Sequence, residues 1–234
     1  METLLAIETS SAVLSLAVQN SKGSQYSKSF KGPHNHAEKI VPFIDELFKK
    51  SKTSLEKTSA FLTGRGPGSF TGLRVGFATL KGFLALEKIP CYGALSLDII
   101  AENKKFKKLP EGSHLAVALD AFRQKIYLRV YEMRSKEWVP KGEVQTLNFA
   151  QTFETIPEKS LVTGNALAKY EKEFKQRAAA KKIKFAEEKL WCPQASALIE
   201  LFNKKDPKIQ KVSEQELLPL YFRLSEAEER AAAL

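Results

Sequence analysis

One segment, Gly64-Arg65-Gly66-Pro67-Gly68-Ser69-Phe70-Thr71-Gly72-Leu73-Arg74-Val75-Gly76, gathers the residue types that could bind an anion. Ala60 to Thr63, before it, read as a short buried strand, and apolar residues after it recur at helical spacing. Glycines allow a ligand to approach the backbone, and the free N–H groups of a helix start attract negative charge. The sequence therefore predicts a helix-start loop that is either a structural turn or a phosphate-binding surface. Its key residues are Gly64, Gly66, Gly68 and Ser69.

Three familiar motifs fail in this loop. A Walker loop needs Lys and then Ser or Thr after its last glycine, but Gly72 is followed by Leu73 and Arg74. The dinucleotide pattern would place its third glycine at Thr71, and the loop lies far from the first strand. A serine-hydrolase elbow needs a glycine two residues to either side of its serine, and Ser69 lacks them. The loop thus indicates none of these three chemistries.

The composition indicates a globular, cytoplasmic protein. The 234 residues are 43% hydrophobic and 27% charged, which suffices for one large domain or two lobes. No apolar run approaches the length of about 20 residues that spans a bilayer, and Met1 to Ile7 is too short for a signal peptide. Cys91 and Cys192 have no Cys-x-x-Cys or His-rich surroundings, so neither a disulfide nor a zinc site is predicted.

The chain has a formal net charge of +10, which favours a polyanionic partner but identifies no ligand. Its densest basic stretch is interleaved with glutamates, a mixture typical of a solvated helix. Two interpretations stay open for this stretch: a solvated face, or contact with a phosphate backbone. The basic residues are Lys169, Lys172, Lys175, Arg177, Lys181, Lys182, Lys184 and Lys189.

The order of periodic segments predicts the elements that would hold the loop. Three strands joined by short turns come first, at Thr3 to Ile7, Val13 to Gln19 and Gln25 to Phe30. A helix should follow from near Asn35, and Pro42 inside it predicts either a kink or a later start. After the loop and its helix come a strand, a short helix and, beyond Pro110, a second set of strands. This order is β-β-β-α-β-α-β-α and then begins again.

These residues together resemble the TsaB family, bacterial proteins of tRNA threonylcarbamoyladenosine synthesis. The resemblance is strong from Leu4 to about Leu97, patchy from there to Arg223, and its segments occur in the family's order. They are the helix-start loop, Glu8-Thr9-Ser10, His36 and Glu38 before Ile-Val-Pro, Tyr92 to Leu97, Leu119-Asp120-Ala121 with Tyr127, and Pro219-Leu220-Tyr221-Phe222-Arg223.

The resemblance implies an α/β fold of two actin-like lobes (ASKHA, ribonuclease H-like) with mixed sheets flanked by helices. The second lobe is expected to be degenerate. We expect the first lobe at 1–108, the second at 109–222, and a C-terminal helix at 223–234 that either returns to the first lobe or frays.

A nucleotide site in this fold would lie at two turns, and here both are altered. Working members place an aspartate toward a bound magnesium, whereas this chain has Glu8, one methylene longer, followed by Thr9 and Ser10. At the second turn, Asp120 is followed by residues 121–123, which supply no glycine. We therefore expect a vestigial nucleotide site and no ATP hydrolysis by the chain alone.

A metal site and catalytic residues are not predicted. The family's catalytic paralogue, TsaD, holds a metal through two histidines four residues apart on one helix face. In this chain His34 and His36 are two residues apart and would point to opposite sides, and His114 has no cluster around it.

Pairing with another protein is the role that the resemblance implies. From the residues alone, Gly72 and Gly76 form a smooth patch that either accepts another helix or packs on the chain's own sheet. The family pairs through its first two helices with TsaD or with another copy of itself. The implied interface residues are Ile40, Phe43, Ile44, Leu47, Gly72, Val75, Gly76 and Thr79.

The resemblance thus implies a non-catalytic subunit that supports TsaD, which transfers threonylcarbamoyl to adenosine 37 of tRNAs reading codons that begin with A. The implied partners are TsaD, the P-loop ATPase TsaE, a second copy of the chain in the absence of TsaD, and tRNA through the complex. No cofactor is expected to bind tightly, and ATP or ADP only at the interface with TsaD. The alternative is an independent actin-fold phosphotransferase in which Glu8 and Asp120 organise Mg-ATP; a glycoprotease would lack its metal pair and its nucleophile and base.

Overall fold

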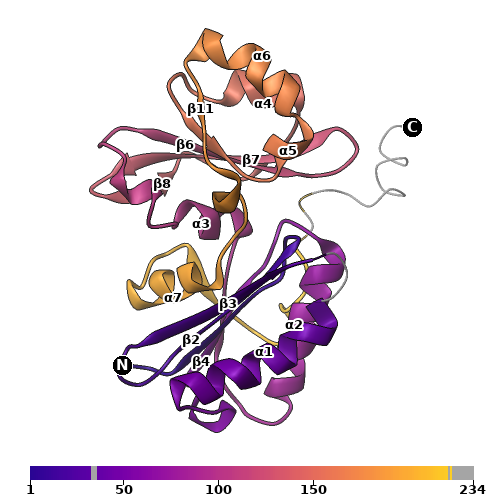
Figure 1. Cartoon of the computed structure of the whole chain (residues 1–234), viewed down its shortest axis with the longest axis vertical. Coiled ribbons are helices and arrows are strands. Elements are labelled where there is room, and N and C mark those ends of the chain that lie inside the picture. The colour runs from indigo at the N-terminus through magenta and orange to yellow at the C-terminus, as the bar shows by residue number, and fades with distance from the viewer. Residues whose placement is uncertain (33–35, 221, 223–234) are drawn as a thin grey trace.

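Two lobes, each built on one mixed β-sheet, stack along the long axis of the molecule (Figure 1). The computed structural model describes residues 1–32, 36–220 and 222. Helices flank both sheets. The predicted fold class, two actin-like lobes with mixed sheets, is confirmed.

The first sheet has the order β12-β5-β4-β1-β2-β3. Its first three strands form an antiparallel meander, and β1, β4 and β5 run parallel. Every residue of β1 and β4 is buried, because helices cover both faces of these strands. The strands are β1 (Leu4–Glu8), β2 (Val13–Gln19), β3 (Gln25–Lys31), β4 (Ala60–Gly64), β5 (Cys91–Ala94) and β12 (Ile209–Val212).

Helices α1 (His36–Ser51) and α2 (Phe70–Leu84) pack beside each other on one face of this sheet (Figure 1). The turn η1 (Leu55–Lys57) follows α1. Helix α1 continues through Pro42, so the expected later start is wrong. The expected cap, Asn35, lies outside the described residues.

The second sheet repeats the order of the first. Its path β11-β10-β6-β7-β8 matches β5-β4-β1-β2-β3 strand for strand, with the same antiparallel and parallel pairs. It is degenerate in two respects, since β11 has only two residues and an extra strand, β9, pairs with β7. The strands are β6 (His114–Asp120), β7 (Lys125–Arg134), β8 (Glu137–Pro140), β9 (Gln145–Asn148), β10 (Leu161–Thr163) and β11 (Lys184–Phe185).

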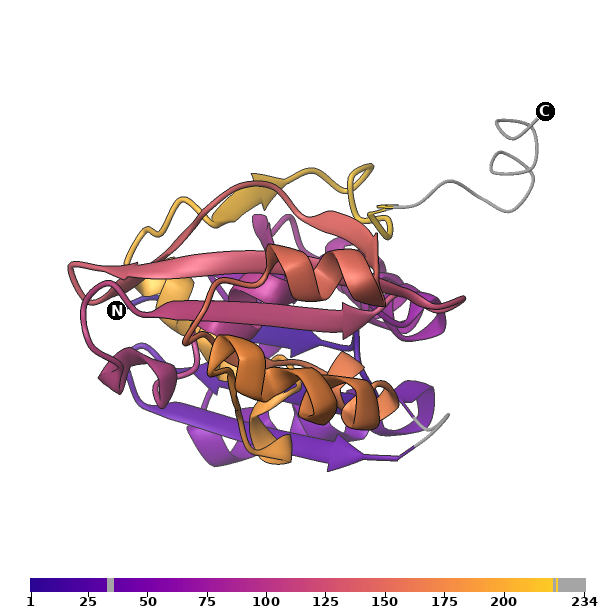
Figure 2. The same cartoon turned by 90° about the horizontal axis from the view of Figure 1, so that it is seen from above.

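Helices α4 and α6 cover the outer face of the second sheet, as the view from above shows (Figure 2). Helix α3 lies between the two sheets and buries all of its residues. The remaining elements are α3 (Ser96–Ala101), η2 (Phe106–Lys108), α4 (Phe149–Thr155), α5 (Ala166–Lys169), α6 (Glu171–Lys181) and η3 (Glu188–Leu190).

The chain returns to the first lobe before its end. Helix α7 (Ala195–Asn203) packs on β1, β2 and β4, and β12 pairs antiparallel with β5, with Val212 opposite Cys91. The expected division, 1–108 and 109–222, assigns this segment to the second lobe, whereas strand pairing assigns it to the first. The expected helix at 223–234 lies outside the described residues.

Candidate functional site

Glu8 is the last residue of β1 and is fully buried. Its Oε1 accepts a hydrogen bond of 2.6 Å from the backbone N–H of Ser10, whereas its Oε2 has no hydrogen-bond partner in the described part of the chain. Burial raises the pKa of this carboxyl to about 7, although the hydrogen bonds from Ser10 and Thr9 oppose the shift. Near neutral pH the side chain is therefore partly protonated.

The glycines of the helix-start loop pack closely against Glu8 and the turn that follows it. A Cβ at Gly64 would overlap Glu8 Oε2, one at Gly72 would overlap the carbonyl oxygen of Thr9, and one at Gly76 would lie 2.5 Å from Thr9 Oγ1. Side chains larger than hydrogen are therefore excluded by the chain's own backbone and side chains. The interpretation of Gly72 and Gly76 as interface residues is wrong for this reason.

Hydrogen bonds fix the loop to the same turn. Ser69 accepts a hydrogen bond of 3.1 Å from the N–H of Gly72 and so caps α2, and its own N–H donates to the carbonyl of Ser10 at 2.6 Å. The carbonyl of Gly66 accepts from the N–H of Ser96, whose hydroxyl donates to Ser10 Oγ at 2.7 Å. These contacts give the loop a structural role, while Gly68 and Ser69 also line the cleft between the lobes.

Asp120 occupies in the second lobe the position that Glu8 occupies in the first, at the end of the corresponding strand. Lys169 Nζ lies 2.8 Å from Asp120 Oδ1, and this oxygen also accepts a hydrogen bond from the N–H of Phe122. The backbone N–H of Asp120 donates to Asn165 Oδ1 at 2.8 Å. Sequence reasoning named Lys169 only as part of the basic stretch and missed the contacts of Lys169 and Asn165 with Asp120. No motif links these two residues to Asp120.

A cleft of about 490 Å³ separates the two turns. Ser10, Ser69 and Asp120 all line it, so the structure brings these predicted residues together. Glu8 and Thr9 do not line it, because the turn and the loop glycines bury them beneath its wall. The four residues expected to form one vestigial nucleotide site are thus split between the cleft and the layer below it.

The carboxylates of the two turns, Glu8 and Asp120, are poorly placed to hold magnesium. Mg²⁺ requires near-octahedral oxygen ligands and keeps several waters. Glu8 is buried against Gly64 and has a raised pKa, and Asp120 is already bound by Lys169. An ATP-dependent phosphotransferase would need both carboxylates free and facing the cleft.

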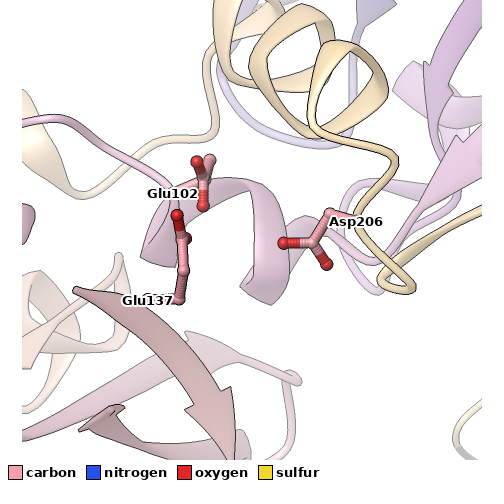
Figure 3. A group of neighbouring side chains, drawn as sticks. All are labelled: Glu102, Glu137 and Asp206. Carbon is pink, nitrogen blue, oxygen red and sulfur yellow. The ribbon is translucent and has the colours of Figure 1, made fainter. Parts of the chain in front are cut away.

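Among the described residues, one acidic cluster brings its carboxylate oxygens within 4.8 Å of one another: Glu102, Glu137 and Asp206 (Figure 3). Lysines already occupy the space between these carboxylates. Lys204 Nζ lies 2.7 Å from Glu102 and 2.9 Å from Glu137, Lys107 also binds Glu102, and Lys208 lies 3.0 Å from Asp206. The cluster is a balanced ion-pair network that joins η2, β8 and the end of α7.

The described histidines lie apart. His36 begins α1 on the cleft wall, and burial lowers its pKa. His114 begins β6 in the other lobe, where Lys141 Nζ lies 3.4 Å from its Nε2. His34 lies outside the described residues. The described residues therefore offer no histidine pair for a metal.

The family model described as TsaD, tRNA N6-adenosine threonylcarbamoyltransferase, matches residues 31–231. The chain belongs to this family. Similar relatives carry the description tRNA threonylcarbamoyladenosine biosynthesis protein TsaB. The one from Haemophilus influenzae is 28% identical, over 94% of this chain and 93% of the relative, and the one from Buchnera aphidicola (Baizongia pistaciae) is 24% identical, over 94% and 98%.

Solved structures agree with this assignment at the level of the fold. YeaZ from Pseudomonas aeruginosa superimposes with a TM-score of 0.76 at 24% identity, over 95% of this chain and all of that one. Within the family the chain is of the TsaB type, and the relatives' own descriptions name tRNA threonylcarbamoyladenosine biosynthesis. Among the described residues, the helices are too short or too polar to cross a membrane.

The expected interface residues of this TsaB-type chain divide by burial. Ile40, Ile44 and Leu47 are 2%, 3% and 2% exposed because they pack into the core beneath α1, so their assignment to the interface is wrong. Phe43 is half-buried against Phe30. The half-buried Val75 and Thr79 stay as interface predictions.

Proposed function

We propose that the chain is a non-catalytic subunit of the complex that forms N6-threonylcarbamoyladenosine at position 37 of tRNAs reading codons that begin with A. It acts by binding the catalytic paralogue TsaD. The observation that carries this proposal is the state of the two turns: Glu8 is buried against Gly64, and Asp120 is paired with Lys169. A TsaB-type chain that keeps the fold but not the free carboxylates is suited to binding a partner rather than to phosphate chemistry.

The surface that we propose for binding TsaD is the outer face of α1 and α2. Val41 is 53% exposed and Phe70 is 41% exposed, so both apolar side chains are available to a partner. The guanidinium of Arg74 stacks on Phe70 at 3.9 Å from the ring centroid. Small exposed residues on α2 let another helix approach closely. This α1–α2 outer face consists of Val41, Phe70, Thr71, Arg74, Ala78 and Gly82, with Val75 and Thr79 at its margin.

The same face serves the other proposed states of the protein. In the absence of TsaD, a second copy of the chain occupies it and forms a homodimer. TsaE joins the complex as its ATPase, ATP or ADP binds only where this chain meets TsaD, and tRNA is bound through the assembled complex in the cytoplasm.

The test is threonylcarbamoyl transfer to tRNA by TsaD, TsaE and ATP, with and without this chain. We expect activity only in the complete mixture, and none from this chain with ATP and tRNA alone. Val41→Asp should weaken the pairing with TsaD and reduce transfer, because it places a charge on an apolar contact. Val139→Asp, the same change at a 37% exposed residue of β8, should leave both unchanged. Transfer that does not depend on this chain would exclude the proposal.

A further inference from the structure

A groove of about 420 Å³ opens on the second lobe, where the parallel strands β6, β10 and β11 begin. Half-buried Leu109 and Leu161 contribute apolar surface to it. Its lining residues also include His114 and three lysines, Lys159, Lys182 and Lys184.

Strand register brings these basic residues together from distant parts of the sequence. Leu161 of β10 pairs with Lys184 on one side and with Leu115 on the other, so β11 and β6 flank β10. The N–H of Lys159 donates to the carbonyl of Lys181 at 2.7 Å, and that of Lys184 donates to Ser160 at 3.0 Å. Paired strands lie about 4.8 Å apart, so the lysines stand on adjacent backbones.

Most other basic residues of the stretch at 169–189 have partners within the protein, unlike Lys182 and Lys184. Lys169 pairs with Asp120, Lys175 pairs with Glu171, and Lys181 donates to carbonyls at the end of α4. These side chains therefore already have partners within the protein. Most of the basic stretch is therefore the solvated or internally paired surface that its composition indicates.

Lys159, Lys182 and Lys184 differ because they are exposed and form no ion pair with any described residue. No carboxylate is among the described residues that line the groove. Like charges placed close together repel, and an anion in the groove would relieve that repulsion. Lysine ammonium groups on flexible stems suit phosphate oxygens, which they contact as point charges.

We propose that this basic groove contacts the phosphate backbone of tRNA. The inference rests on the proposed function, since it names a surface through which the subunit contacts tRNA within the complex. The groove lies on the second lobe, whereas the α1–α2 outer face lies on the first, so the two surfaces share no residue. Figure 1 shows α1 and α2 on one lobe and β6 and β11 on the other. One chain can therefore hold TsaD and tRNA at the same time.

The test uses the assembled complex and a triple variant, Lys159→Gln, Lys182→Gln and Lys184→Gln, with tRNA affinity measured over a series of salt concentrations. Each lost phosphate contact removes about 0.7 to 0.9 from the slope of log affinity against log salt. We expect a slope smaller by about 2 to 3, and an affinity about tenfold weaker or more at moderate salt.

The matched control is Lys22→Gln, Lys52→Gln and Lys88→Gln, which removes the same charge from exposed lysines of the first lobe that have no ion pair among the described residues. It should bind tRNA nearly as wild type does. Equal slopes for the two triple variants would overturn the groove assignment.

Pairing with TsaD is measured separately on the same variants and should be unchanged in both. Wild type that fails to pair with TsaD would count against the proposed function, whereas intact pairing with an unchanged salt slope would count against the groove alone. The two failures are therefore distinguishable.

Discussion

Arg129 Nη1 lies 2.9 and 3.0 Å from the two carboxylate oxygens of Asp98, and this pair fastens the two lobes together. Asp98 lies on α3 between the sheets, and Arg129 lies on β7 of the second lobe. Tyr131 donates a further hydrogen bond of 2.7 Å to Asp98, and both charged side chains are nearly buried. Such a connection opposes the opening and closing of the cleft between the lobes.

Removal of one member of this pair should destabilise the protein strongly. Asp98→Ala leaves the guanidinium of Arg129, 10% exposed, with only the exposed Glu143 as a counter-ion at 4.0 Å, and the loss of a buried partner costs about 3 to 5 kcal/mol. The measurement is the free energy of unfolding in urea. The double variant Asp98→Leu with Arg129→Met should recover much of the loss because it leaves no buried charge. A single variant as stable as wild type would show that water reaches the pair.

Glu8 predicts how stability depends on pH. Its pKa is raised from 4.5 to about 7 in the folded protein, so between these values the folded state binds more protons than the unfolded state. Because protons stabilise the folded state in this range, the free energy of unfolding falls as pH rises from 4.5 to about 7, by about 3 kcal/mol in total at most. The stabilisation is complete below pH 4.5 and is lost above pH 7.

Glu8→Gln isolates this effect, because the amide keeps the size of the side chain and does not titrate. Unfolding in urea at several pH values measures the free energy of unfolding of both proteins. We expect the two values to differ little at low pH, and the variant to become more stable relative to wild type as pH rises. Parallel stability curves for the two proteins would mean that Glu8 does not carry the raised pKa.

The sequence predicted the fold well because its signals are local or familiar. The strand from Thr3, the helix-start loop and the apolar face of α1 all follow from periodicity and turn residues. The return of β12 to β5 was not predicted, since a four-residue strand, Ile209–Val212, carries no signal for its distant partner.

The candidate site was predicted only in part, and for a related reason. Periodicity shows that Ile40 and Gly76 lie on helix faces, but it does not show which face meets the chain's own core. Only the folded structure shows that Ile40 is buried and that Gly76 contacts Thr9, and these contacts identify the inner face of each helix. Lys169 lies far from Asp120 in sequence, so their ion pair had no local signal.

Two glycines of α2 offer a matched test of the internal role of the loop. Gly72→Ala should destabilise the isolated chain by about 1 to 3 kcal/mol, because its Cβ would overlap the carbonyl oxygen of Thr9. Gly82→Ala, on the same helix but with no atom within 4 Å, should stabilise it by about 0.5 to 1 kcal/mol through helix propensity. Thermal unfolding of the chain without partners measures both. If Gly72 matters only to a partner, Gly72→Ala will unfold as wild type does.

The isolated chain should not bind Mg-ADP at micromolar concentrations, an affinity of about −8 kcal/mol. Asp120 is held by Lys169, and Glu8 is buried beneath the cleft wall. The variant Lys169→Ala frees Asp120 but leaves Glu8 in place, so it too should fail to bind. Titration calorimetry with wild type and Lys169→Ala distinguishes a non-catalytic subunit from an independent phosphotransferase. Saturable micromolar binding by wild type would support the phosphotransferase, and binding by the variant alone would identify Lys169 as the residue that closes an otherwise complete nucleotide site.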